Sequence, residues 1–186
     1  MTASISITWS ESLSGTSITT LDHGAGPNGT TFTEKEVFFR VENNVSSITD
    51  CKLYIAALTS GYTGAATANE DYDELIAWGD ASASTDFGGV FVNMNAIGGY
   101  PEADWATFTS KSKTYSFVAN STQGGNLAEA VTISSQAIGD GSGIDGTVAA
   151  GAPENVRFKV RIVIPNSEST TGIRQIAFGL KYTSTT

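Results

Sequence analysis

The chain has 186 residues, of which 19 are acidic and 10 basic, and its formal net charge is −9. This balance leaves no basic surface for phosphate groups, so nucleic acid is not an expected partner. Charged residues make up only 16% of the chain, against about a quarter in an ordinary soluble domain. The single cysteine, Cys51, excludes a disulfide within the chain, so the fold must rest on packing or on association.

The sequence begins MTASISITWSE, which lacks the basic start and the apolar core of a secretory signal peptide. No stretch approaches the ~18 consecutive apolar residues of a membrane-spanning helix. We therefore expect a protein that is made in a cytosol, stays soluble there and has no membrane partner.

Apolar and polar residues alternate with a period of two along much of the chain, which predicts β-strands. The first strand is predicted over residues 3–9, and apolar positions continue through 16–21. A Gly-rich loop follows over 22–30, in which Asn28 and Gly29 form a tight-turn signal.

Two strong strands are predicted next, over residues 35–42 and 50–58. Each carries its apolar residues on one face: Val37, Phe39 and Val41 in the first, and Cys51, Leu53, Ile55 and Ala57 in the second. Because only a short polar stretch joins them, the two strands are predicted to pair as a hairpin.

One short helix is predicted over residues 70–78. Its apolar residues recur at helical spacing, at Tyr72, Leu75 and Ile76. Acidic residues early in the run favour the positive end of the helix dipole. Asn69 is the expected N-cap, and Gly79 is the expected stop.

The remaining strands are predicted over residues 87–96, 113–119, 127–133, 155–164 and 173–182. Gly88 and Gly89 indicate a bulge or a close backbone approach. A long Gly-rich loop over 139–153 is of the kind that is functional or packed against another surface. In the strand over 155–164 the apolar residues face one way, and Arg157, Lys159 and Arg161 face the other.

Many short strands, turn-marked connections and one helix are typical of an all-β fold. We predict an antiparallel β-sandwich, jelly-roll or immunoglobulin-like, with one short helix near 70–78. A closed barrel is the alternative. No break in composition indicates a second domain, so residues 1–186 are predicted to form one.

The sequence shows no set of residues suited to catalysis. A Ser–His–Asp triad would have to use the only histidine, His23, and a solvent-facing loop histidine is the simpler interpretation. One Cys and one His cannot supply the usual ligands of a zinc site, and Cys51 is interpreted as a buried, inert thiol. We predict no enzyme activity, no catalytic, cofactor-binding or metal-binding residues, and no cofactor.

Two groups of carboxylates are the remaining candidates for a chemical role. Four lie on the predicted helix, namely Glu70, Asp71, Asp73 and Glu74, and a solvated first helical turn is favoured over a glycosidase pair. Asp140 and Asp145 lie in the sequence DGSGIDG, where oxygen-rich loops can bind calcium. Their spacing does not match an EF-hand, so an ordinary turn is favoured.

Four aromatic residues have two interpretations, namely Trp9, Trp78, Tyr100 and Trp105. They are expected to anchor the core and turns, and the alternative is a platform on which sugars stack. The basic row of Arg157, Lys159 and Arg161 is likewise expected to be a solvated sheet face. It could instead pair with an acidic surface on a second copy.

Three segments carry a resemblance to a known family. They are EKEVFFRVENNVSSITDCKLYIAAL, then DYDELIAWGD with GGVFVNMNA and YPEADWATF, and last PENVRFKVRIVIPNSESTTGIRQIAFGLKYT. Together, over residues 34–182, they resemble small tailed-bacteriophage virion structural proteins with a β-sandwich fold, of the head decoration or tail and baseplate accessory type. The resemblance implies a virion component and carries no catalytic motif.

We therefore expect a non-enzymatic structural component of a phage virion, assembled in the host cytoplasm. Its partners would be other virion proteins and copies of itself. The expected contacts are the loops 22–30 and 139–153, the edge strands and the two termini. The alternative is a carbohydrate-binding module or adhesin domain that holds a glycan through Trp78, Tyr100 and Trp105.

Overall fold

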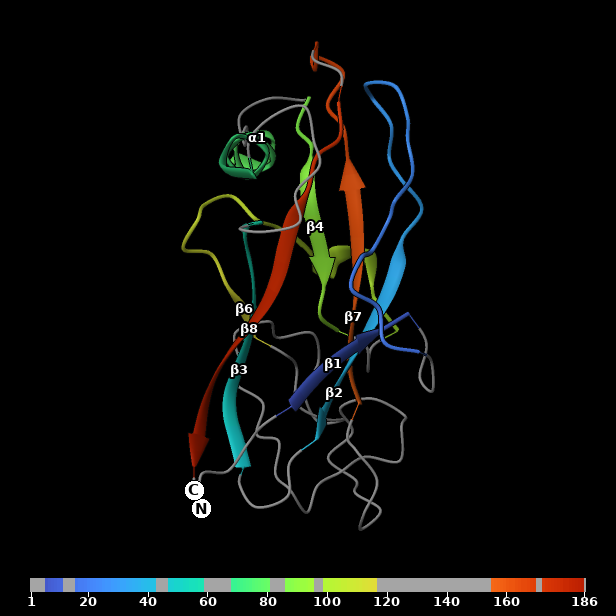
Figure 1. Ribbon diagram of the computed structural model, residues 1–186. Helices are drawn as coiled ribbons and strands as arrows, with labels where there is room; N and C mark the ends of the chain where they lie inside the picture. Colours follow the sequence, from blue (N-terminus) through green and yellow to red (C-terminus); the bar gives the residue numbers. More distant parts are fainter. Residues whose placement is uncertain are drawn as a thin grey trace.

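The computed structural model describes residues 6–11, 16–42, 47–58, 68–80, 86–95, 99–116, 155–169 and 172–185. Within these ranges the chain forms eight strands in two antiparallel sheets, one α-helix and one turn of 3-10 helix (Figure 1). The expectation of a mostly antiparallel β fold with one short helix is confirmed.

The larger sheet has five strands and places β7 at its centre. Its order is β1 (Ser6–Ser10), β2 (Lys35–Glu42), β7 (Asn155–Val163), β4 (Gly89–Asn93) and β5 (Trp105–Thr107). The smaller sheet consists of β6 (Tyr115–Ser116), β3 (Ser47–Ala57) and β8 (Ile176–Thr185), in that order. The 3-10 turn, η1 (Glu102–Asp104), leads directly into β5.

The predicted hairpin between the second and third strands is wrong. β2 pairs with β1 and β7, whereas β3 pairs with β6 and β8 in the other sheet. The physical reason is that both strands have an apolar face to bury. Val37 of β2 and Leu53 and Ile55 of β3 join the same buried cluster. Strands in two different sheets can cover each other's apolar faces, which neighbours in one sheet cannot do.

The buried core draws on both sheets and on the helix. Its members are Val37, Leu53, Ile55, Tyr72, Leu75, Ile76, Val90, Val92, Met94, Phe108, Tyr115, Phe158 and Val160. Phe158 of β7 has its ring centroid 6.2 Å from that of Trp9 and 6.0 Å from that of Phe178 on β8. Burying one such side chain contributes about 1.5–3 kcal/mol, and the contact of Phe158 with Phe178 joins the two sheets.

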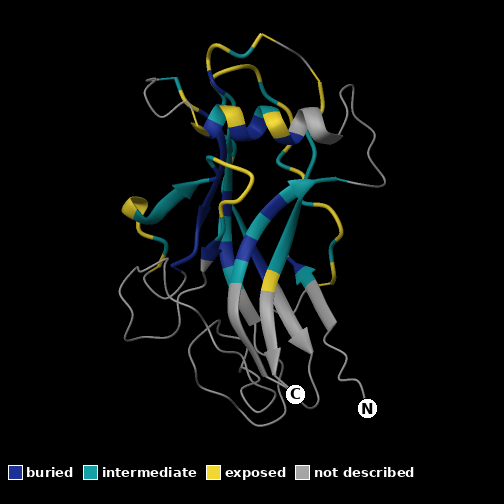
Figure 2. Ribbon diagram, turned by 90° about the vertical axis from the view of Figure 1, so that its left-hand side faces the viewer, coloured by how far each residue is buried: buried dark blue, intermediate teal, exposed yellow. Residues whose placement is uncertain are grey.

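Helix α1 (Ala68–Asp80) lies across one end of the strands, as Figures 1 and 2 show from two directions. It buries Tyr72, Leu75 and Ile76, the three residues that the spacing predicted. Its ends differ from the prediction. The helix begins at Ala68, before the expected N-cap Asn69, and it continues past the expected stop at Gly79 to Asp80. No helix in the described ranges is long and apolar enough to cross a membrane.

Glycine is needed at position 79, inside the helix, because the helix backbone approaches the larger sheet closely there. A Cβ atom on Gly79 would lie 2.5 Å from the carbonyl oxygen of Phe108. From the sheet side, Gly89 has a φ of +103°, and a Cβ there would lie 2.9 Å from the carbonyl oxygen of Leu75. The close backbone approach expected at the Gly88–Gly89 pair is thus confirmed.

Several predicted strands differ in extent from the observed ones. Residues 16–21 contain no strand, and β4 covers five residues of the described part of 87–96. Within 113–116, the described part of 113–119, Tyr115 and Ser116 form β6. The runs over 3–9, 155–164 and 173–182 correspond to β1, β7 and β8 with shifted ends. The strand over 127–133 and the loop over 139–153 lie outside the described residues.

The loop over 22–30 is fastened to the turn that follows β7. Asn28 and Gly29 form the predicted tight turn, with Gly29 at a φ of +78°. The side-chain amide of Asn28 donates hydrogen bonds to the carbonyl oxygens of Asn166 and Glu168, at 3.1 and 3.0 Å. The loop therefore presents a fixed surface.

The same turn is held from its other side by Asp86. The carboxylate accepts hydrogen bonds from the backbone amides of Asn166 and Ser167, the latter at 2.7 Å. These bonds, the one from Asn166 first, hold the pKa of Asp86 below its ordinary value. The folded protein therefore favours the ionised form of this carboxyl more than the unfolded chain does.

Asp86→Asn should lower the free energy of unfolding at pH 7. Because the pKa is lowered on folding, the stabilisation is complete above the ordinary value of about 4 and is lost as the pH falls through the folded value. Urea unfolding at pH 7 should separate the variant from the parent protein, and the two curves should converge below about pH 4. Asp80→Asn, at the exposed C-terminal end of α1, is the control and should not lower stability at pH 7. A gap between the Asp86→Asn variant and the parent that is independent of pH would contradict this account.

Candidate functional site

Aromatic and basic side chains gather on the side of the five-stranded sheet that faces away from the buried cluster. We call this side the outer face and define it by Glu36, Phe38, Phe91, Asn93, Tyr100, Trp105, Arg157, Lys159 and Arg161. Strand register brings them together, because Phe38 lies opposite Arg157, Phe91 opposite Arg161, and Asn93 opposite both Lys159 and Trp105. Residues from β2, β4, β5 and β7 thus meet on one surface.

Each basic side chain of β7 lies over at least one aromatic ring. The guanidinium carbon of Arg161 is 4.2 Å from the ring centroid of Trp105 and 5.6 Å from that of Phe91. The ammonium of Lys159 is 4.9 Å from the Tyr100 ring. Such cation–π contacts contribute about 0.5–1 kcal/mol at exposed sites and more when water is excluded. They also fix the orientation of otherwise flexible side chains.

The same basic row is paired with carboxylates of this chain. Lys159 lies 3.0 Å from Glu34, and Arg161 lies 3.1 Å from Glu102. Arg161 also lies 3.7 Å from Glu34, and Arg157 lies 3.7 Å from Glu36. The expectation of a merely solvated basic face is therefore wrong, and no second copy is needed to supply the acidic groups. Glu34, Glu36 and Glu102 together balance the three charges of the basic row.

Beneath these charged groups, three residues of the outer face are buried. Phe38 and Phe91 are almost fully covered, and Asn93 is 0% exposed. The side-chain amide of Asn93 donates to the carbonyl oxygen of Pro101 at 2.8 Å, and its oxygen accepts from the backbone amide of Asn95. Asn93 therefore holds the segment that leads into β5 against the sheet.

Tyr100 fastens that segment in an unusual backbone conformation. Its φ is +60°, a left-handed value that costs a bulky residue of order 1–3 kcal/mol. Its hydroxyl donates a hydrogen bond to Glu36. Burial, followed by that bond, raises the pKa of Tyr100 well above its ordinary value, so the phenol stays neutral. The strained turn is thus held by a specific polar contact on the outer face.

No family model matches the chain. A comparison with curated proteins also finds no match. The role of the outer face must therefore follow from its own residues.

The predicted aromatic set is divided by the structure. Tyr100 and Trp105 lie together on the outer face, whereas Trp78 lies on α1, where its indole N–H donates to Glu168 at 2.9 Å. Trp78 also packs against the buried cluster, as does Trp9. The three residues proposed to hold a glycan therefore do not form one platform, and the aromatic anchors expected for the core are confirmed at Trp9 and Trp78.

Of the four acidic residues predicted on the helix, the two whose side chains are described lie beyond its first turn. Asp73 and Glu74 lie in the middle of α1, where they pair with Lys111 and Arg174 respectively. The side chains of Glu70, Asp71 and Cys51, and the whole of Asp140 and Asp145, lie outside the described part. Among the residues that are described, no three His, Cys, Asp or Glu side chains gather as a metal site.

His23 is half-buried, which differs from the predicted solvent-facing position. Its ring packs edge-on against Phe32, with the centroids 6.4 Å apart. Burial, and then the nearby charge of Lys35, lower the pKa of His23. The ring is therefore neutral at pH 7 and acts as a packing residue in its loop.

Sequence reasoning missed Phe38 and Phe91 as parts of the outer face. One signal was present for each of them. Phe38 and Phe39 are adjacent, so one ring must face away from the core, and Phe91 alternates with the core residues Val90 and Val92.

The fixed rings, paired cations and bound carboxylates of the outer face suit the recognition of another surface. These groups place no nucleophile beside a base.

Proposed function

We propose that this protein is a non-enzymatic structural component of a tailed-bacteriophage virion. In this proposal the two sheets form a single β-sandwich domain, and the outer face contacts a neighbouring subunit. The buried cluster shared by both sheets supports the sandwich. The partners would be other virion proteins or copies of this chain, and the place of action is the virion.

One observation carries the proposal. Trp105, Tyr100 and Arg161 share the outer face and are only partly covered. Arg161 lies over the ring of Trp105, and Tyr100 is held by Lys159 and Glu36. Tryptophan, tyrosine and arginine are the residue types that dominate binding energy at protein interfaces. Side chains already held in position lose little entropy on binding, which favours a stable contact.

The charge distribution also favours the outer face as the surface that contacts a neighbouring subunit. Copies of a chain with a net charge of −9 repel one another wherever acidic surfaces meet. On the outer face the pairs formed by Lys159 and Arg161 neutralise Glu34 and Glu102, so a neighbour can approach there without that repulsion. The loop over 22–30, held by Asn28, offers a second fixed surface.

The proposal is tested by the composition of purified virions. The chain should be present at a fixed copy number, and Trp105→Ala should reduce its incorporation by about tenfold or more. Glu102→Lys should act similarly, because its side chain is 77% exposed and its new charge repels Arg161. Lys181→Ala, at an exposed position of β8, is the control and should be incorporated normally.

Circular dichroism and urea unfolding must show that each variant is folded before its incorporation is measured. Absence of the chain from purified virions would overturn the virion assignment. Normal incorporation of both Trp105→Ala and Glu102→Lys would overturn the outer face as the contact.

The second candidate is a carbohydrate-binding module or adhesin domain. The sequence suggested it because Trp78, Tyr100 and Trp105 could form one sugar platform, but Trp78 lies apart from the other two. A different feature, a hollow beside Phe87, favours sugar binding independently.

A further inference from the structure

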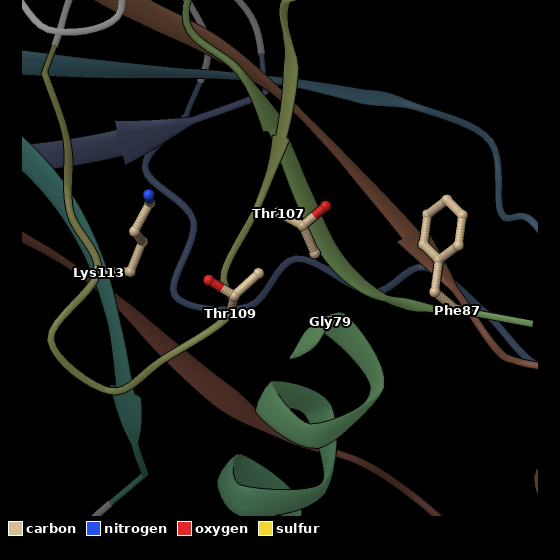
Figure 3. A pocket seen from close by; sticks show the side chains of 5 residues that line it. All are labelled: Gly79, Phe87, Thr107, Thr109 and Lys113. Carbon is tan, nitrogen blue, oxygen red and sulfur yellow. The ribbon is translucent and has the colours of Figure 1, made fainter. Parts of the chain in front are cut away.

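A hollow of about 300 Å³ lies where the end of α1 meets the larger sheet, and Figure 3 shows it from close by. Its lining residues are Gly79, Phe87, Thr107, Thr109 and Lys113. In the figure Thr107 and Thr109 lie between Phe87 on one side and Lys113 on the other, and the helix end at Gly79 lies below them. A volume at the small end of ligand pockets suits a compact ligand such as a single sugar residue.

Phe87 supplies an exposed but fixed aromatic ring. Its exposed fraction is 49%, and it is one of two large apolar residues left open in the described part of the chain. The ring is held by Phe91, with the two centroids 5.8 Å apart. The negatively polarised face of such a ring attracts the C–H groups on the apolar side of a sugar.

Lys113 supplies a positive charge that the described residues leave unpaired. Its ammonium lies 5.4 Å from the ring centroid of Tyr115 and contacts no described carboxylate. Lys111, two residues earlier, is by contrast paired with Asp73. In a chain with a net charge of −9, an ammonium that no described carboxylate neutralises, at the edge of a hollow, favours a ligand that carries an anionic group.

We propose that this hollow binds a sugar that bears a carboxylate. The ring of Phe87 would stack on the sugar, Lys113 would bind its carboxylate, and the hydroxyls of Thr107 and Thr109 would hydrogen-bond to its hydroxyl groups. The aromatic ring selects a sugar over a simple anion, and the ammonium selects an acidic sugar over a neutral one. The hollow adjoins the outer face, because Phe91 contacts Phe87 and lies opposite both Thr107 and Arg161. The proposal nevertheless does not depend on the virion assignment.

The test is a calorimetric titration of the full chain with galacturonic, glucuronic and N-acetylneuraminic acids. At least one should bind saturably, and its neutral counterpart or acetate should bind at least about tenfold more weakly. Phe87→Ala and Lys113→Gln should each weaken binding of the acidic sugar by about tenfold or more. Lys181→Gln, which removes an exposed lysine elsewhere, should leave the affinity unchanged.

Phe87 and Lys113 are exposed, so both variants should keep their fold, and thermal unfolding checks this. Binding should also weaken with added salt, because Lys113 makes an exposed charge contact. Failure of all three acids to bind would overturn the proposal, and so would equal binding of a neutral sugar or an undiminished affinity in Lys113→Gln. None of these outcomes bears on whether the chain is found in virions.

Discussion

Phe158→Ala is expected to lower the free energy of unfolding by about 3–5 kcal/mol, the cost of removing a large side chain from a well-packed core. Phe158 is 0% exposed and lies on β7, the central strand of the larger sheet. Its ring contacts Trp9 on one side and Phe178 of the smaller sheet on another. Truncation would leave a cavity that neither sheet can fill without moving.

Guanidinium unfolding followed by far-ultraviolet circular dichroism measures this loss. A typical domain is stable by only about 5–15 kcal/mol, so the variant should unfold at a much lower denaturant concentration. Phe87→Ala is the matched control, because it is the same chemical change at a half-exposed ring that packs against Phe91, and it should cost no more than about 1.5 kcal/mol. Equal losses in the two variants would contradict the assigned core.

Gly79→Ala is the second substitution with a large expected effect. The informative result is whether it raises or lowers the free energy of unfolding. Helix propensity alone predicts a gain of up to about 1 kcal/mol when alanine replaces glycine inside a helix. The structure predicts a loss instead, because the new Cβ would lie 2.5 Å from the carbonyl oxygen of Phe108. Forcing α1 away from the sheet should cost about 1–3 kcal/mol, as in other overpacked sites.

Urea unfolding of Gly79→Ala beside Ala77→Gly separates the two effects. Ala77 lies on the exposed side of the same helix, so its replacement reports propensity alone and should cost about 1 kcal/mol. A stabilised Gly79→Ala protein would show that the helix end does not pack against the segment around Phe108.

The sequence predicted most of the described strands and the apolar side of those in the core, but it missed β5 and did not show which strands become neighbours. Period-two alternation reports the face on which a side chain lies, and the pattern of 155–164 correctly placed Phe158 opposite to Arg157 and Arg161. Alternation contains no information on pairing. For that reason the short connection after β2 suggested a hairpin, whereas β2 and β3 belong to different sheets.

The candidate site was predictable only in part for a related reason. The basic row was legible in one strand, but its carboxylate partners come from distant segments, at Glu34, Glu36 and Glu102. Trp78 and Trp105 looked equivalent as aromatic residues beside turns, and only the position of α1 separates them. The hollow beside Phe87 involves three separate segments, which no local pattern could bring together.

Because β7 lies late in the chain, the larger sheet cannot form completely until most of the protein has been synthesised. Glu34, next to β2, meets Lys159 of β7 across 125 positions of sequence, and β4 also depends on β7 for its central neighbour. A ribosome therefore releases β1, β2, β4 and β5 before the strand that unites them exists. A two-stranded ribbon alone is only marginally stable in water, and long-range pairing is slow. The nascent chain is thus expected to acquire its structure late and to need protection from aggregation until β7 emerges.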